Sequence, residues 1–237
     1  MRKTIIVVAL LALGAVAATG CMPAEDSCDV KTSGIKLELA ATEEAGTAKG
    51  QAIFWTDEGR AMVLGDCGDK ITVNGVEMEA EDGTVTPIVY SSAVDATGTY
   101  EFVFTRPDED DYVSTVTGLR PAVTITAPES GTEAPRDVAL AVTWEDNNAG
   151  AGDGQIAAVV TGECLSEIDY EATWTDDGED EIPADGLSAD DETASCQAEL
   201  VLTREVDGTL DSDLNQTGSI KGWSVGRTSF TTIPTAP

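Results

Sequence analysis

The sequence predicts an all-β protein made of two tandem β-sandwich domains. Its regularly patterned segments alternate apolar and polar residues with period two, and none shows the 3.6-residue period of an amphipathic helix. Turn residues separate these segments every roughly 8 to 12 residues, which is typical of sandwiches. Glycine is abundant, at 23 of 237 residues, as expected for a chain with many turns.

The first predicted sandwich spans residues 28–121. Its clearest local signal is Asn74-Gly75 between two alternating runs, which predicts a hairpin with a two-residue type I′ turn. The register of this hairpin places Ile71, Val73, Val76 and Met78 on one face. The other expected inward residues are Ile35, Leu37, Leu39, Tyr100, Phe102 and Phe104.

The second predicted sandwich spans residues 122–237, after a boundary at Leu119-Arg120-Pro121. A closing strand is expected over 219–232, and residues 176–192 are expected to form a long acidic loop. The predicted inward faces comprise Val138, Leu140, Val142 and Trp144, then Ile168, Tyr170, Ala172 and Trp174, and finally Cys196, Ala198, Leu200 and Leu202.

The N-terminus is typical of an export signal. Arg2 and Lys3 open the chain, an apolar run covers residues 5–18, and small residues precede Cys21. The run is shorter than the roughly 20 residues that a membrane-spanning helix needs. We therefore expect a cleaved signal peptide, not a membrane span.

Residues 17–21 (Ala-Ala-Thr-Gly-Cys) resemble the lipobox of bacterial lipoproteins. The resemblance implies cleavage just before Cys21, a diacylglycerol on the Cys21 thiol, and acylation of the new amino terminus. Ala18 departs from the usual leucine. On this interpretation residues 1–20 are the signal peptide, residues 21–27 are a polar tether, and lipid holds the protein on the cell envelope, at the outer membrane on its periplasmic or surface side. The alternative is an ordinary secretory signal.

In the second half, a segment ending in Ala134-Pro135 is followed by a turn and then by the strand pattern of residues 138–144. This order resembles that of immunoglobulin-like modules. The cysteine-tryptophan-cysteine order of antibody domains is absent, because Trp144 precedes both Cys164 and Cys196. The resemblance therefore implies a fold and no particular ligand.

The charge of the chain is strongly negative, with 44 Asp and Glu against 13 Lys and Arg, a net −31. Because residues 1–20 contain only the two charges of Arg2 and Lys3, cleavage takes the net charge to −33. Such a polyanion is repelled by phosphate backbones, so we exclude nucleic-acid binding. Anionic headgroups repel it as well, so the lipid must provide the anchoring. The acidic, lysine-poor composition also suits a saline habitat.

Four cysteines remain besides Cys21, and an even number in an exported chain indicates disulfides. Three pairings are possible. Their order along the chain favours Cys28–Cys67 and Cys164–Cys196, one in each half. A zinc site is disfavoured because the chain has no histidine and no C-x-x-C pair.

The absence of histidine also excludes the usual Ser-His-Asp and Cys-His nucleophiles. A glycan hydrolase needs only two carboxylates, which chance provides in so acidic a chain, so this enzyme class stays open as the alternative. We expect no catalytic residues and no cofactor.

Calcium is the metal whose ligands this chain could supply, through acidic loops at residues 108–111, 145–148 and 176–181. None has EF-hand spacing, so we expect solvated surface without a metal. Trp144 and Trp174 are expected in the core, and Trp223 is expected at the surface. The sequence thus favours a non-enzymatic interaction or structural module, whose partner is the membrane through Cys21 and an envelope protein or a glycan.

Overall fold

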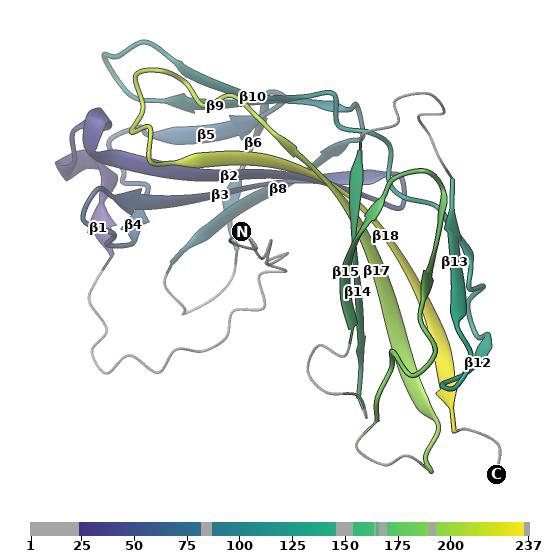
Figure 1. Cartoon of the computed structure of the whole chain (residues 1–237). Helices are drawn as coiled ribbons and strands as arrows, with labels where there is room; N and C mark the ends of the chain where they lie inside the picture. The colour runs from purple at the N-terminus through teal and green to yellow at the C-terminus, as the bar shows by residue number, and fades with distance from the viewer. Residues whose placement is uncertain are drawn as a thin grey trace, which may run out of the picture.

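The computed structural model describes residues 24–81, 87–145, 154–163, 165, 170–189 and 193–234. Over these residues the chain forms β-strands and two short 3-10 helices, η1 (Ser27–Asp29) and η2 (Thr32–Gly34), with no α-helix. The predicted all-β fold is therefore confirmed (Figure 1). No helix in these ranges is long and apolar enough to cross a membrane.

The first sandwich packs two sheets face to face. One sheet has the strand order β10-β9-β5-β6, and the other contains β18-β2-β3-β8-β7. A short parallel pair, β1 with β4, lies at one end. The bounds are β1 Glu25–Asp26, β2 Ile35–Glu44, β3 Thr47–Thr56, β4 Met62–Val63, β5 Lys70–Val73, β6 Val76–Glu77, β7 Glu79–Ala80, β8 Val89–Asp95, β9 Thr99–Thr105 and β10 Tyr112–Thr117.

The second sandwich places the three-stranded sheet β11-β13-β16 opposite the strands β15-β14-β17-β18, and β12 pairs with the end of β18. The bounds are β11 Ile125–Ala127, β12 Glu133–Pro135, β13 Leu140–Trp144, β14 Gln155–Gly162, β15 Tyr170–Thr175, β16 Glu179–Ile182, β17 Cys196–Asp207 and β18 Ser219–Ile233. Because β16 lies within residues 176–192, the prediction of one long acidic loop there is wrong.

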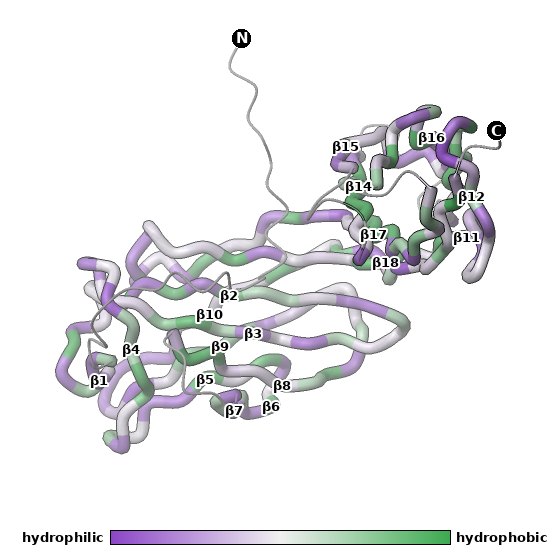
Figure 2. Tube along the Cα trace, turned by 90° about the horizontal axis from the view of Figure 1, so that it is seen from below, coloured by the Kyte–Doolittle hydropathy of each residue, from purple (hydrophilic) through white to green (hydrophobic). Residues whose placement is uncertain are grey.

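Two long strands connect the sandwiches. β17 and β18 have 12 and 15 residues and pair with each other from Cys196↔Thr232 to Asp207↔Lys221. The first part of β18 pairs in parallel with β2, whereas the first part of β17 pairs with β14. One nine-stranded sheet therefore runs from the first sandwich into the second, and Figures 1 and 2 show it passing between the two lobes.

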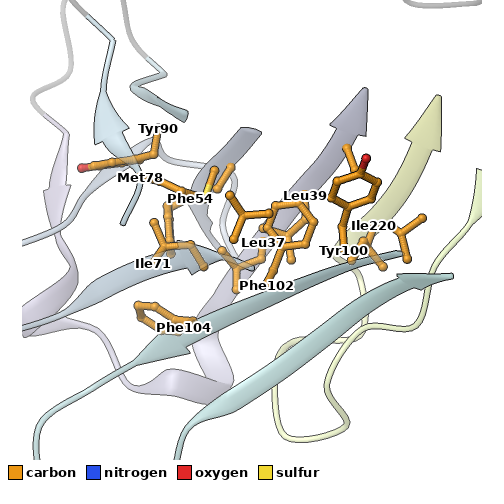
Figure 3. Packing of buried hydrophobic residues seen from close by; sticks show 14 of the residues in the cluster. Leu37, Leu39, Phe54, Ile71, Met78, Tyr90, Tyr100, Phe102, Phe104 and Ile220 are labelled. Atoms are coloured by element: carbon orange, nitrogen blue, oxygen red, sulfur yellow. The ribbon is translucent and has the colours of Figure 1, made fainter. Parts of the chain in front are cut away.

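The core of the first sandwich is rich in aromatic residues. Phe54 contacts Phe104 and Tyr90, with ring centroids 5.3 and 5.6 Å apart. Figure 3 shows these rings near Ile71 and Met78, in one cluster that also contains Leu37 and Leu39 of β2. The predicted inward residues of residues 35–39 and 100–104 are all buried, as alternation on a half-buried strand requires.

The core of the second sandwich is mostly aliphatic and contains one stacked tryptophan pair. The rings of Trp144 and Trp174 lie 5.8 Å apart and nearly parallel. The inward residues from Cys196 to Leu202 are buried as predicted, as are Val142 and both tryptophans. Val138 is 56% exposed, because β13 begins only at Leu140. Ile168 lies outside the described residues.

The predicted hairpin joins β5 and β6. Asn74 and Gly75 both have positive φ, 48° and 77°, as a type I′ turn requires. Ile71, Val73 and Met78 are buried, but Val76 is 45% exposed, so the prediction of a fully buried face is wrong at this position. The reason is that β6 is the edge strand of its sheet.

The sequence predicts two boundaries, the end of the tether at residue 27 and the division between the domains after residue 121. The tether predicted over 21–27 is wrong at its end, because Glu25–Asp26 is a strand and Ser27 is fully buried. The division into domains 28–121 and 122–237 stays a prediction. The structure adds that Leu214 and Ile220 pack in the first core, since β18 begins in the first sandwich.

Candidate functional site

The predicted site residues are cysteines, and the structure places some of them. Cys28 and Cys67 form a disulfide with their Cα atoms 6.0 Å apart. Cys196 is also disulfide-bonded, and its predicted partner Cys164 lies outside the described residues. Cys21 lies outside them too. The Cys164–Cys196 pairing and the lipidation of Cys21 therefore stay predictions.

A buried arginine secures the chain next to the Cys28–Cys67 disulfide. Arg106 donates hydrogen bonds to the carbonyl oxygens of Ser27 and Val30, both at 2.9 Å, and to the hydroxyl of Thr32 at 2.8 Å. Its Nε lies 3.3 Å from the carboxylate of Asp69. One guanidinium thus fixes the segment 27–32 to the first sandwich; we call this group the N-terminal clamp.

A second buried cluster lies between the sandwiches. Asp176, directly after β15, accepts hydrogen bonds from Arg204 Nε at 2.7 Å, Arg204 Nη2 at 2.9 Å, Trp144 Nε1 at 2.9 Å and Arg120 Nη1 at 2.5 Å. Arg120 belongs to the linker between β10 and β11, and its carbonyl accepts a hydrogen bond from Ser224 of β18. We call Arg120, Trp144, Asp176 and Arg204 the joint.

The environment of Asp176 keeps it ionised. Burial by itself raises the pKa of this carboxyl group, but the hydrogen bonds from Arg204 and Trp144 and the charges of Arg204 and Arg120 outweigh burial. The pKa of Asp176 therefore lies below its usual value. Its contribution to stability is present above the pKa of an unfolded aspartate and is lost as pH falls through the lower folded value.

A groove of about 820 Å³ opens beside the joint. It is lined by residues 43–46, 96–98, 119, 121–125 and 225–227. Its one deeply buried charge is Glu43, which accepts hydrogen bonds from Tyr100 OH at 2.5 Å and from the Gly98 amide at 2.9 Å. Burial, followed by the hydrogen bond to Glu43, raises the pKa of Tyr100 to about 12. This carboxylate thus fixes the turn between β8 and β9.

Gly226 explains how the linker packs against β18 beside this groove. A Cβ on Gly226 would lie 2.2 Å from the carbonyl oxygen of Val123, which is backbone and has little freedom to move. Glycine at this position therefore permits the close approach of linker and strand.

Four of the six buried charges among the described residues share a sequence signal that the predictions above do not use. Each of the four occupies the next inward position after an alternating apolar run: Glu43 after Ala41, Arg106 after Phe104, Asp176 after Trp174, and Arg204 after Leu202. Extending the period-two pattern by one step finds all four. Continued alternation points these side chains inward at the end of a run, where they meet partners from other segments.

The acidic loops proposed for calcium are only partly described. In residues 108–111, the Glu109 carboxylate accepts a hydrogen bond from Thr32 at 2.7 Å and another from Tyr112. In residues 176–181, Asp176 belongs to the joint. Residues 146–148 lie outside the described ranges. Within those ranges, no three His, Cys, Asp or Glu residues are grouped closely enough to hold a metal ion.

Trp223 is half-buried on the outer face of the nine-stranded sheet, where its indole N–H donates to Glu205 at 2.9 Å. The prediction of a surface position for this residue is therefore correct only in part. The neighbouring Lys221 also pairs with Glu205, so this face carries a small charged network.

Comparison with known proteins does not identify a family for this chain. No protein-family model and no curated protein matches the chain. Among solved structures, it is similar to the fibronectin(III)-like modules of Clostridium thermocellum CbhA, at 15% identity over 84% of this chain and 93% of that chain, with a TM-score of 0.25. It is also similar to the Yersinia pseudotuberculosis adhesin InvE, at 11% identity over 82% and 58% of the two chains, with a TM-score of 0.22. At these TM-scores neither similarity carries an argument about this chain.

Proposed function

We propose that the protein is an exported, lipid-anchored module of the bacterial cell envelope that acts without catalysis, as an interaction or structural element. Residues 17–21 support the anchoring, because they place Cys21 directly after a signal-like apolar run. The proposed partner is an envelope protein or a glycan, and the proposed location is the outer membrane, on its periplasmic or surface side.

One structural observation carries the non-enzymatic part of the proposal. Among the described residues, the buried carboxylates of Glu43, Asp69 and Asp176 all bind groups of the protein itself. Glu43 holds the turn between β8 and β9, Asp69 belongs to the N-terminal clamp, and Asp176 belongs to the joint. A catalytic carboxylate must instead face a substrate. The shared strands β17 and β18 add a second support, since they suit a rigid spacer between a membrane and a partner.

The anchoring is tested by fractionation of cells that produce Cys21→Ser. We expect the wild-type protein in the membrane fraction and the variant in the soluble envelope fraction. A Cys28→Ser/Cys67→Ser double variant is the control, because it removes two other cysteines but keeps the acceptor, and it should stay with the membrane. A Cys21→Ser variant that remained membrane-bound would contradict lipidation at this residue.

The absence of catalysis is tested with purified lipid-free protein and envelope glycans. We expect cosedimentation without release of new reducing ends. Release of reducing ends that is abolished by a single Asp or Glu substitution would favour the glycan hydrolase instead.

A further inference from the structure

The chain is fixed to the first sandwich almost from the first described residue. Glu25–Asp26 pairs in parallel with Met62–Val63, and the Glu25 amide donates to the Ala61 carbonyl at 2.9 Å. The Glu25 carboxylate lies 3.1 Å from the guanidinium of Arg60. The segment that follows the proposed acceptor is therefore a strand of the fold.

Three further interactions fix the residues that follow. Ser27 is fully buried and accepts a hydrogen bond from the Gly65 amide at 3.0 Å. Cys28 is in the disulfide, and Arg106 binds the carbonyl oxygens of Ser27 and Val30. A Cβ on Gly65 would lie 1.9 Å from the Asp26 carboxylate and 2.3 Å from the Cys28 sulfur, so the segment packs tightly here.

The length of chain that remains outside this fixed segment is short. Only Met22, Pro23 and Ala24 separate Cys21 from Glu25. Even fully extended, the four steps from Cys21 to Glu25 span at most about 14 Å. β1 and β4 lie at the end of the first sandwich that is remote from the second (Figure 1).

We propose that the β1–β4 end of the first sandwich is the membrane-proximal surface and rests on the lipid headgroups, with β12 of the second sandwich far from them. The inference depends on the proposed acylation of Cys21 and adds the orientation that a short stem imposes. A freely mobile tether through residue 27 would impose no such orientation.

The charges at this end of the protein suit contact with a membrane whose headgroups carry little negative charge. Arg60 lies in the turn that follows β3, and it is already engaged by Glu25 and Glu58. Asp57 is also exposed in this turn. Acyl chains therefore hold an acidic end against the headgroups, so anionic lipid should weaken attachment and added salt should restore it.

The test uses the acylated full-length protein in liposomes of phosphatidylethanolamine and phosphatidylcholine. A photo-crosslinking phenylalanine analogue replaces Glu58 in one variant and Asp137 in a matched control. Both residues are exposed, and Asp137 lies in the turn that follows β12, at the far end of the second sandwich. We expect at least a tenfold greater lipid adduct from position 58. Equal adducts, or a greater adduct from position 137, would overturn the orientation.

Two additional readouts separate this inference from the proposed function. Mass spectrometry of the N-terminal peptide reports acylation, and an unacylated Cys21 would overturn both proposals. Acylated protein with the wrong crosslinking pattern overturns only the orientation. An insertion of about 12 flexible residues after Pro23 lengthens the stem to an average of about 22 Å. It should reduce the adduct at position 58 while the protein stays on the liposomes, whereas an unchanged adduct would contradict control by stem length.

Discussion

Arg106 of the first sandwich and Arg204 of the second are both buried, but their guanidinium groups have different partners. Arg106 of the first sandwich binds two carbonyl oxygens, a hydroxyl and one carboxylate, that of Asp69. Arg204 of the second sandwich donates two hydrogen bonds to one carboxylate, that of Asp176, which also accepts a hydrogen bond from Arg120. The first arrangement fixes a terminal segment, and the second fixes the linker between the sandwiches.

The difference indicates where each cluster is vulnerable. Neutral oxygens still solvate Arg106 when its carboxylate is removed. Without Asp176, Arg204 keeps, among the described residues, only the carbonyl of Glu145 at 3.2 Å, and within the same residues its Nη1 already lacks a partner. Uncompensated buried charge is among the largest costs that one substitution creates. The joint should therefore be much more sensitive than the N-terminal clamp.

The largest effect is expected for Asp176→Asn. We expect the free energy of unfolding to fall by about 3–5 kcal/mol, because two arginines lose their shared anion. Chemical denaturation measures this, with the exposed neighbour Asp177→Asn as the control. The difference from wild type should shrink in acid, since the lowered pKa of Asp176 makes its contribution vanish as pH falls through that value. Equal stability of the two variants would show that the joint contributes nothing.

Removal of the disulfide should have the next largest effect. Cys28→Ser/Cys67→Ser opens a loop with a sequence separation of 39 residues. A loss of roughly 2–4 kcal/mol follows from the greater entropy of the unfolded chain. In thermal unfolding, reductant should lower the melting temperature of the wild-type protein more than that of the double variant, which lacks this disulfide. Non-reducing peptide mapping provides the check on pairing, and a Cys164–Cys196 peptide is the expected second product.

A smaller effect is expected for Asp69→Asn in the N-terminal clamp. Arg106 keeps its three neutral acceptors, so the loss should be about 1–2 kcal/mol, close to that of one charged hydrogen bond. The comparison with Asp176→Asn by the same denaturation assay tests the proposed difference directly. A cost as great as that of Asp176→Asn would refute it.

The smallest effect concerns Tyr100. Its folded pKa of about 12 lies above the usual value, so its contribution is complete below about pH 10 and is lost as pH rises toward the folded value. Stability measured from about pH 9 to about pH 11 should therefore fall more steeply for wild type than for Tyr100→Phe. Parallel curves would mean that the pKa of Tyr100 is the same in the folded and the unfolded protein.

The sequence predicts the strands better than the connections between them. The local alternation of apolar and polar residues correctly predicts that residues such as Phe102 and Leu200 are buried. Successive side chains of a strand point to opposite faces, so the adjacent residues in the sequence show which face is apolar. The exposure of Val76 and the packing of Ile220 in the first core depend on which strands lie at an edge and which strands are shared. Those are properties of long-range pairing, which a local pattern does not contain. The partners of Arg106 and Arg204 are equally long-range, although their inward positions follow the alternation.

The most direct test of the shared-sheet account is native-state hydrogen exchange along β18. Ile220 lies in the first core and Phe230 in the second, on one continuous strand. If β17 and β18 join the sandwiches into one cooperative unit, both amides should open with the same free energy, and Asp176→Asn should lower both equally. Different opening energies, with Asp176→Asn affecting only Phe230, would show two independent sandwiches and contradict the account.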